Sequence, residues 1–274
     1  MHVEKYLQRV GFKGRAQADL DSLQRIHRGH ALNIPYENLD IQFGRAVSRD
    51  VACIFDKIVN GRRGGWCYEM NGLLAWALED LGFRITRLAG GVRRSEVGDQ
   101  ALGNHLVLLV HLERDYLADV GFGDGLIEPV PLEVGTFRQG GSEFQLESLA
   151  EGWWRFHGDA RGGGLSFDFD VTPACERLLE SKCQWLQTSA ESVFVQNAIV
   201  QRHLDGSHAA LRGCVLRLVG KLQEVRELKS ADEYVETLRE VFGLDLPEAS
   251  GIWPRIEARH KQVFPNGFSA ALKS

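Results

Sequence analysis

The sequence has no long apolar run, no block of like charges and no low-complexity tract. Apolar stretches such as residues 106–110 are far too short to cross a bilayer. Acidic and basic residues nearly balance, with 37 Asp and Glu against 32 Lys and Arg and a net charge of −5. Because neither sign gathers into a patch along the chain, we expect no nucleic-acid partner and no binding to an anionic membrane.

Cysteine is sparse, and its spacing forms no known pattern. The five cysteines lie far apart without a C-x-x-C pair, so the sequence predicts neither a disulfide framework nor a zinc site, and we expect no metal cofactor. The first fifteen residues carry charges throughout and hold no apolar core of signal-peptide length. Together these features favour a protein of the reducing cytoplasm.

Several catalytic and phosphate-binding patterns are also missing. The chain has no Rossmann or Walker glycine pattern, no G-x-S-x-G elbow and no H-E-x-x-H helix. What it does hold is 44% apolar residues over 274 positions, which is enough for a sizeable core. Length alone suggests about two domains.

The first third of the chain has the periodicity of helices. Apolar residues recur at steps of three and four over residues 19–32, 51–59 and 68–81. Gly82 follows the last of these segments, in the position where glycine often ends a helix. The pattern predicts a helical N-terminal domain over residues 1–82.

The next hundred residues change to short runs of branched and aromatic residues separated by turn residues. Residues 83–92, 106–112 and 116–120 are typical of strands, with residues 113–115 as a hairpin turn. Similar short runs continue beyond them. They predict a small antiparallel sheet or barrel in a second domain over residues 83–188.

The last third mixes apolar runs with one strongly marked helix. Residues 230–233 form a capping box, and apolar residues follow at helical spacing up to Gly243. We expect a smaller α/β unit over residues 189–274, packed against the other domains without long linkers. The whole is then an α+β fold, and a gap between its domains is the natural place for a ligand.

The stretch RRGGWCYEMN, residues 62–71, is the most informative in the sequence. Its two glycines allow a sharp loop, and Cys67 then falls in the first turn of the helix that follows. The free N–H groups and partial positive charge of a helix start stabilise a thiolate, which lowers the pKa of a cysteine there. Cys67 is therefore a candidate nucleophile, with a buried structural thiol as the more common role of a free cysteine.

A cysteine nucleophile needs a base, and two histidines border an apolar strand. His105 precedes residues 106–110 and His111 follows them, whereas most other histidines lie among charged or loop residues and are expected to be solvated. Asp119 lies in the next predicted strand, where a carboxylate needs a charged partner to be buried. Cys67, His105 and Asp119 would supply the nucleophile, base and orienting acid of acyl transfer, with His111 as the competing base.

Simple hairpin register does not bring this acid to this base. With a turn centred near Arg114, Asp119 lies opposite Leu108. His105 is then three residues away, which is about 10 Å along a strand. A bulge or a wider hairpin is needed to close that distance.

Four separated strings match one known family in the same order. They are IPYENLDI at residues 34–41, RGGWCYEMNG at 63–72, NHLVLLV at 104–110 and YLADVGFG at 116–123. Through these strings the chain resembles the arylamine N-acetyltransferases, densely over residues 6–123 and more thinly beyond.

The resemblance implies a helical bundle, a central β-barrel and a C-terminal α/β lid, with the Cys-His-Asp core of papain-like and transglutaminase-like thiol enzymes. It implies that Cys67, His105 and Asp119 form a catalytic triad. It also implies acetyl-coenzyme A as co-substrate and an aromatic amine or hydrazine as acceptor. The acetyl group would pass from the co-substrate to the acceptor in a ping-pong reaction through an acetyl-cysteine. Such a reaction belongs to xenobiotic metabolism.

The same resemblance implies which residues contact the two substrates. Three residues are expected to line the acceptor pocket: Tyr36, Val92 and Phe122. Core packing is the alternative role of these three. Three others are expected to contact coenzyme A: Asn104, Gly123 and Phe194.

Two other functions use the same triad residues. A thiol hydrolase, either an amidase or a peptidase, would pass the acyl group to water, and an open groove would favour it over a deep, covered cleft. A non-enzymatic interaction protein would hold the three residues as structural groups. In that case the Cys67 thiol would have an ordinary pKa and would react slowly with alkylating reagents.

Overall fold

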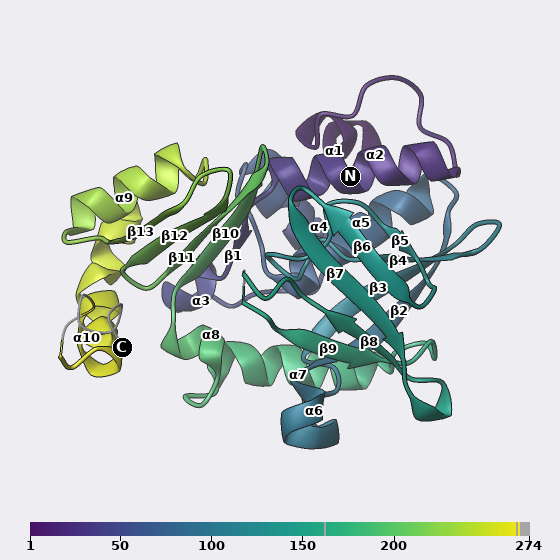
Figure 1. Ribbon diagram of the computed structural model, residues 1–274. Coiled ribbons are helices and arrows are strands. Elements are labelled where there is room, and N and C mark those ends of the chain that lie inside the picture. The colour runs from purple at the N-terminus through teal and green to yellow at the C-terminus, as the bar shows by residue number, and fades with distance from the viewer. Residues whose placement is uncertain (162, 267, 269–274) are drawn as a thin grey trace.

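The computed structural model describes residues 1–161, 163–266 and 268. These residues form an N-terminal group of helices, an eight-stranded antiparallel sheet and a five-stranded antiparallel sheet. Figure 1 shows the two sheets side by side, with helices packed around them. The arrangement confirms the predicted α+β fold with a central barrel-like sheet.

The N-terminal group ends in the helix that carries the candidate nucleophile. Its elements are α1 (Val3–Arg9), α2 (Leu20–Asn33), the short strand β1 (Tyr36–Glu37), α3 (Leu39–Gln42), α4 (Val51–Phe55), the π-helix η1 (Asp56–Asn60) and α5 (Cys67–Asp80). The helix expected over residues 51–59 is thus split, because its last turn widens until the Gly61 N–H bonds to the Asp56 carbonyl oxygen.

α5 lies at the centre of this group. Its apolar side chains are fully enclosed: Leu73, Leu74, Ala75, Ala77 and Leu78. The helix ends before Gly82, which has a φ of +89° and so adopts the left-handed conformation that glycine accepts most readily. Burial of these side chains fixes the direction of α5, and with it the position of the residues in its first turn.

The eight-stranded sheet curls into a nearly closed barrel. Its strands are β2 (Arg84–Val92), β3 (His105–His111), β4 (Asp115–Ala118), β5 (Val130–Pro131), β6 (Gly135–Gln139), β7 (Ser142–Ser148), β8 (Trp154–His157) and β9 (Ser166–Phe169), in the order β5-β4-β3-β2-β9-β8-β7-β6. Two short turns, α6 (Arg94–Val97) and η2 (Gly98–Ala101), join β2 to β3, and η3 (Ala150–Gly152) joins β7 to β8.

One side chain spans the seam between the ends of this sheet. Gln139 Oε1 in β6 accepts the N–H groups of Ile127 and Glu128, both at 2.9 Å. Its Nε2 donates to the Glu128 carbonyl oxygen, also at 2.9 Å. The barrel interior is filled by aromatic rings, with Phe156 stacked on both Phe144 and Phe167.

The C-terminal part adds helices and the second sheet. Its elements are α7 (Glu176–Thr188), α8 (Val193–Gln196), β10 (Ile199–Leu204), β11 (Ser207–Arg212), β12 (Val215–Gly220), β13 (Glu224–Glu227), α9 (Ala231–Glu240), η4 (Pro247–Ile252) and α10 (Trp253–Val263). The N-terminal strand β1 pairs with β10 and so completes this sheet. The helix expected after residue 230 is present as α9, with the Ser230 hydroxyl accepting the Glu233 N–H.

α7 was not expected from the sequence. It lies within residues 83–188, which were assigned to the barrel domain. Its buried residues, Leu179, Cys183 and Leu186, follow the helical spacing i, i+4, i+7, so a signal was present.

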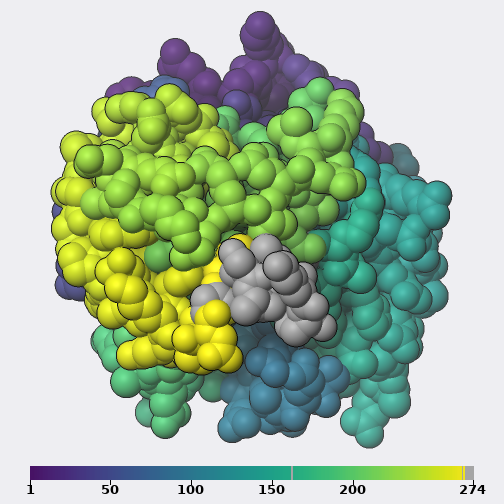
Figure 2. Space-filling view, turned by 60° about the vertical axis from the view of Figure 1, so that its left-hand side comes forward, coloured from purple at the N-terminus to yellow at the C-terminus, as the bar shows by residue number. Residues whose placement is uncertain are grey.

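The C-terminal part packs closely on the barrel. Figure 2 shows the light-green segment of the second sheet in direct contact with the teal barrel segment. Within the described residues, no helix has the length and apolar character needed to span a bilayer.

Candidate active site

Cys67 is the first residue of α5, in the place that the preceding glycines predict. A Cβ atom at Gly64 would lie 2.0 Å from the Pro35 carbonyl oxygen, and one at Gly65 would lie 2.8 Å from Cβ of Glu69. No side chain fits at either position. The loop therefore passes between β1 and α5 only because both residues are glycine, and it delivers the thiol to the helix start.

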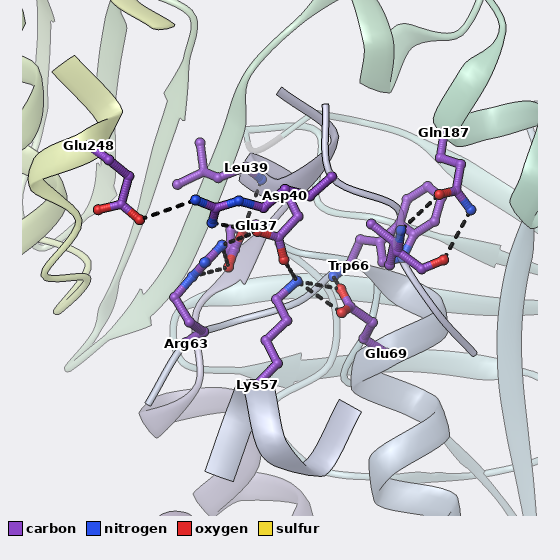
Figure 3. A network of polar contacts seen from close by, with 11 residues as sticks. Glu37, Leu39, Asp40, Lys57, Arg63, Trp66, Glu69, Gln187 and Glu248 are labelled. Atoms are coloured by element: carbon purple, nitrogen blue, oxygen red, sulfur yellow. Dashed lines mark hydrogen bonds and ion pairs between the residues drawn. The ribbon is translucent and has the colours of Figure 1, made fainter. Parts of the chain in front are cut away.

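A cluster of charged side chains packs against this loop (Figure 3). We call it the ionic cluster, and it consists of Glu37, Asp40, Lys57, Arg63 and Glu69. Lys57 Nζ lies 2.9 Å from both carboxylate oxygens of Glu69 and 2.8 Å from Oδ2 of Asp40. Arg63 Nη2 lies 2.7 Å from Glu37 Oε1 and 3.2 Å from Asp40 Oδ1.

The ionic cluster is bonded to the backbone on both sides of the loop. Glu69 Oε2 accepts the N–H of Trp66, the residue before Cys67, at 3.2 Å. The Glu37 N–H donates to the Gly65 carbonyl oxygen at 2.9 Å. Burial raises the pKa of Glu69 to about 7, although the Lys57 ammonium opposes this change. The cluster thus holds the nucleophile loop to β1 and to the π-helix.

His105 and Asp119 meet at the end of the barrel. His105 Nε2 lies 2.7 Å from Asp119 Oδ2, and each residue is 2% exposed. Burial alone would raise the pKa of Asp119. The facing His105 and hydrogen bonds from Asn71 and the Gly121 N–H outweigh it and hold that pKa below its ordinary value. Asp119 is therefore an ionised carboxylate that faces an imidazole.

The register of the β3–β4 hairpin explains how these two residues meet. His111 pairs with Asp115, so the turn is centred one residue earlier than the sequence suggested. Continuing this register sets Asp119 opposite Val107, two residues from His105 and on the same face of the sheet. The predicted register was wrong by one residue, and such a shift turns side chains to the opposite face. Neither a bulge nor a wider hairpin is required.

Cys67 reaches the same place from α5. Its Sγ lies 4.0 Å from the carbonyl oxygen of Asn104, the residue before His105. A Cβ atom at Gly121, two residues after Asp119, would lie 2.8 Å from Cα of Cys67. The loop after β4 therefore packs directly on the first turn of α5. The structure brings the three predicted residues into one buried site.

The thiol is almost completely covered. Cys67 is 2% exposed, and burial raises the pKa of its thiol, against hydrogen bonding from the backbone of Leu106 and Tyr68. This result differs from the expectation that the helix start would lower the pKa. The apolar surroundings disfavour the anion by more than the helix N-terminus stabilises it. A thiolate here therefore requires a base close enough to take the proton.

The chain is similar over most of its length to proteins of one family. The family model described as N-acetyltransferase matches residues 19–251. An arylamine N-acetyltransferase of Mycolicibacterium smegmatis is 33% identical over 270 residues, which cover 92% of this chain and 94% of that protein. Arylamine N-acetyltransferase 1 of Homo sapiens is 29% identical over 275 residues, covering 90% of this chain and 95% of that protein.

Solved structures of such proteins superpose on this chain. The M. smegmatis arylamine N-acetyltransferase gives a TM-score of 0.83 at 32% identity, covering 93% of this chain and 97% of that chain. The Mycobacterium marinum arylamine N-acetyltransferase in complex with CoA gives 0.82 at 28% identity, covering 94% and 98%. The chain belongs to the arylamine N-acetyltransferase family. It is therefore an acyltransferase.

Two residues of this acetyltransferase that sequence analysis did not assign to the site hold Asp119 in place. Asn71 Nδ2 donates to Asp119 Oδ1 at 2.7 Å, and His27 Nε2 accepts the Asp119 N–H at 3.0 Å. Asn71 had a signal, because it lies one helical turn after Cys67 and so shares its face of α5. His27 had none, because it lies 92 residues from Asp119 and only the fold brings it there.

The expectation that most other histidines are solvated was wrong. Four of them are buried: His27, His30, His203 and His208. Their charged neighbours in sequence point away from them, since adjacent residues of a helix or strand face different sides. Burial lowers the pKa of His27 and of His208 to about 4 and that of His203 to about 3, so these rings are neutral near pH 7.

The residues expected at the acceptor pocket of the acetyltransferase differ in how close they lie to the predicted triad residues. Tyr36 and Phe122 line a small cavity beside Asp119. The Phe122 ring centroid is 5.4 Å from that of His105. Val92 lies at the end of β2, where it packs on the barrel core.

The residues expected to contact coenzyme A make clear structural contacts. Asn104 Oδ1 accepts the Val92 N–H at 2.8 Å, which fixes the start of β3. Gly123 also lines the small cavity, and a Cβ atom there would lie 2.7 Å from the Gln201 side chain. The Phe194 ring in α8 lies 5.2 Å from the Trp66 ring.

His111 lies outside the site. Its Nδ1 is 2.6 Å from Asp115 Oδ1 and its Nε2 is 2.8 Å from the Thr86 hydroxyl, at the far end of β3 from His105. Of the two candidate bases, the structure therefore places His105 and not His111 against the Asp119 carboxylate.

A larger cavity adjoins the small one. It has a volume of about 650 Å³ and shares Arg202 and His203 with the cavity beside Asp119. Three more basic residues line it: Arg28, Arg161 and Lys221. No three His, Cys, Asp or Glu side chains of the described residues are placed to bind one metal ion.

Proposed function

We propose that this acyltransferase moves an acetyl group from acetyl-coenzyme A to the nitrogen of an aromatic amine or hydrazine, by way of an acetyl group on Cys67. The observation that carries the proposal is the 2.7 Å contact between His105 and Asp119 beside the first turn of α5. The CoA complex of the M. marinum relative supports a coenzyme A thioester as the donor.

In the first half-reaction, His105 takes the thiol proton of Cys67. Because Nε2 of His105 faces Asp119, Nδ1 is the nitrogen left to accept it. The thiolate attacks the thioester carbonyl carbon, and the bond from that carbon to the sulfur of coenzyme A breaks. The leaving thiolate takes the proton from His105, so the products are acetyl-Cys67 and free coenzyme A. Asp119 stabilises the imidazolium between these steps.

In the second half-reaction, the amine nitrogen attacks the acetyl carbon. The carbon–sulfur bond to Cys67 breaks, and the proton lost by the nitrogen passes through His105 to the Cys67 sulfur. An aromatic amine is a weak base and largely neutral at pH 7, so its lone pair is free to attack. The burial of Cys67 disfavours water as a competing acceptor.

We assign the substrate contacts as follows. The acceptor is bound by Tyr36, Val92 and Phe122, and the position of Phe122 beside His105 supports this assignment. Coenzyme A is contacted by Asn104, Gly123 and Phe194. The basic lining of the 650 Å³ cavity next to the site fits the phosphate groups of such a donor.

We also propose three domains, over residues 1–82, 83–188 and 189–274, of which residues 162, 267 and 269–274 lie outside those described. The first carries Cys67, and the second carries His105 and Asp119. A cytoplasmic location, a role in xenobiotic metabolism and the lack of a nucleic-acid or membrane partner belong to the same proposal. The near balance of charge supports the last point.

The direct test is to mix the enzyme with stoichiometric acetyl-coenzyme A in the absence of an acceptor and to record the intact mass. We expect one acetyl group on Cys67, discharged within the assay by added aniline. Cys67→Ala should carry none. His105→Ala should lose rapid alkylation of Cys67, and His111→Ala should keep it. Absence of the acetyl group, or its loss to water as fast as to aniline, would contradict the proposal and favour a hydrolase in the second case.

A further inference from the structure

α2 carries two fully buried histidines, one helical turn apart. His30 Nδ1 lies 2.9 Å from the Tyr6 hydroxyl, within the core of the helical segment. His27 points to the end of the barrel instead. Its Nδ1 lies 2.9 Å from the Ile127 carbonyl oxygen, and its Nε2 lies 3.0 Å from the backbone nitrogen of Asp119.

These two partners fix the protonation state of His27. A carbonyl oxygen only accepts and a backbone N–H only donates, so Nδ1 carries the proton and Nε2 carries the lone pair. Asp119 and Glu128 favour the charged ring, but burial outweighs both and lowers the pKa of His27 to about 4. His30 on the same helix and His203 of β10 also lie close enough to interact with the ring, and neither supplies a negative charge.

Asp119 needs this partner because of its place in the sheet. β4 ends at Ala118, so the Asp119 N–H has no strand partner, and a buried N–H without an acceptor is unfavourable. Contacts with Asn71, the Gly121 N–H and His105 orient the carboxylate. His27 bonds instead to the backbone nitrogen of Asp119, next to the Cα atom from which that side chain extends.

We propose that His27 is a positioning residue for the acid of the triad, whose Nε2 holds the Asp119 backbone so that the carboxylate stays 2.7 Å from His105. The inference rests on the proposed function, because it requires Asp119 to act on Cys67 through His105. His27 acts through Asp119. Through His27, α2 helps to position the catalytic residues, although α2 lies outside all four sequence strings that mark the family.

The test compares two variants of the same length at position 27. Gln places an amide oxygen near the position of Nε2 and can accept the Asp119 N–H, whereas Met fills similar space without a comparable acceptor. His30→Met is the matched control, since His30 is equally buried on the same helix. For each full-length enzyme we measure thermal unfolding, the rate of Cys67 acetylation by acetyl-coenzyme A, and the pH dependence of Cys67 alkylation by iodoacetamide.

We expect His27→Met to slow acetylation by about tenfold to a hundredfold, because a displaced catalytic group loses a rate factor of this order. The alkylation midpoint should move to higher pH, because a misplaced Asp119 no longer stabilises the imidazolium. His27→Gln should recover most of the rate. His30→Met should lose stability but keep both the rate and the midpoint. Equal rates and midpoints for His27→Met and His30→Met would overturn the inference.

Two further variants separate the possible failures. Should His27→Met not fold, His27→Asn decides instead, because its amide can keep the Ile127 contact but is too short to reach Asp119. Slowing with a raised midpoint supports the inference, and wild-type values overturn it. Asp119→Asn is assayed beside them. If it retains full activity, the proposed triad fails. If it is inactive while His27→Met behaves like His30→Met, only the role of His27 fails.

Discussion

Two buried polar clusters meet at the first turn of α5, and they are built in different ways. The ionic cluster joins opposite charges at 2.7 to 3.2 Å. Its five members are three carboxylates and two cations, which leave a formal charge of −1, since 2 − 3 = −1. The proposed triad site, formed by Cys67, His105 and Asp119, is built around the Asp119 carboxylate. Besides facing His105, this carboxylate accepts hydrogen bonds from the Asn71 amide and the Gly121 N–H, and the Asp119 N–H donates to the neutral His27 ring.

The two clusters therefore differ in role: the ionic cluster fixes the backbone, and the proposed triad site takes part in the reaction. In the ionic cluster every charge already faces an opposite charge, so the cluster fixes the backbone before Cys67 and has little to offer a substrate. In the triad site neutral groups do the holding, so the charge of Asp119 remains available to stabilise an imidazolium. A cationic side chain bound to Asp119 in place of Asn71 and His27 would compete with His105 for that carboxylate.

Removing the charge of Asp119 tests the role of the proposed triad site in the reaction and has the largest expected effect. Asp119→Asn keeps the shape of the side chain but removes the anion that faces His105. We expect acetylation of Cys67 to slow by about 10²-fold to 10⁴-fold, as for the loss of the acid in comparable triads. Rapid-quench mass spectrometry gives the rate, and circular dichroism during heating gives the stability.

The matched control lies in the ionic cluster. Asp40→Asn changes a carboxylate of the same type that contacts Lys57 and Arg63. It should lower the unfolding temperature and leave most of the acetylation rate. Similar rate losses in both variants would mean that the ionic cluster contributes to the reaction as much as the Asp119 carboxylate does.

Removing a cation tests the structural role of the ionic cluster. Lys57→Met leaves the buried carboxylates of Glu69 and Asp40 without their ammonium partner. Breaking one partner of a buried ion pair costs about 3 to 5 kcal/mol of unfolding free energy, which urea denaturation measures. Lys261→Met is the control, because its pair with Glu257 is exposed and should contribute less than about 0.5 kcal/mol. Equal losses would show that burial of the cluster has no energetic role.

Acid should weaken the fold, and buried histidines and buried carboxyl groups contribute to this change with opposite signs. Four histidines are held neutral by burial, with a pKa below the ordinary value: His27, His30, His203 and His208. The unfolded chain binds their protons first as the pH falls below about 6.5, so stability is lost towards pH 4. Glu69 and Asp124, with a pKa raised to about 7 and about 6, bind protons first in the folded state and gain stability over that range.

The number of groups of each kind decides whether stability falls or rises with acid. Near pH 5 the unfolded chain binds about two more protons, since 4 − 2 = 2, which corresponds to a loss of about 2 to 3 kcal/mol per pH unit. Urea denaturation at pH 7, 6 and 5 measures it. His203→Gln should make the dependence shallower and Glu69→Gln should make it steeper. A stability that rises between pH 6 and 5 would contradict the assignment of neutral, buried histidines.

Local patterns were enough to predict much of the fold. The glycine loop and helical spacing placed Cys67 at the start of α5, and runs of branched residues marked β2, β3 and β4. Each of these signals arises from residues close together in the chain, where backbone preference and burial act on the same few positions. The end of α5 at Gly82 is of the same kind.

What failed depended on contacts between distant segments. The hairpin register was wrong by one residue, because the residues between β3 and β4 suit more than one turn position and pairing decides among them. The pKa of Cys67 moved opposite to the expectation, since residues from distant parts of the chain, among them Tyr36, Leu106 and Leu179, pack around it and bury it. His27 was dismissed as solvated because its sequence neighbours are charged, whereas its partners lie 92 and 100 residues away.

The smallest expected effect concerns how closely the two parts of the triad site approach. A Cβ atom at Gly121 would lie 2.7 Å from Asn71 Nδ2 and 2.8 Å from Cα of Cys67. Gly121→Ala should therefore push the loop that carries Asp119 away from α5 and slow acetylation by about tenfold, which corresponds to roughly 1.4 kcal/mol.

A glycine within α5 itself, Gly72, shows whether the effect comes from the site or from the helix. At Gly72 the nearest atom to an added Cβ lies 3.5 Å away, which is ordinary contact. Gly72→Ala should leave the acetylation rate unchanged and stabilise the fold by up to about 1 kcal/mol, because alanine favours the helical backbone. If Gly121→Ala keeps the wild-type rate, the loop after β4 can move without disturbing the triad. The close contact with α5 would then serve stability alone.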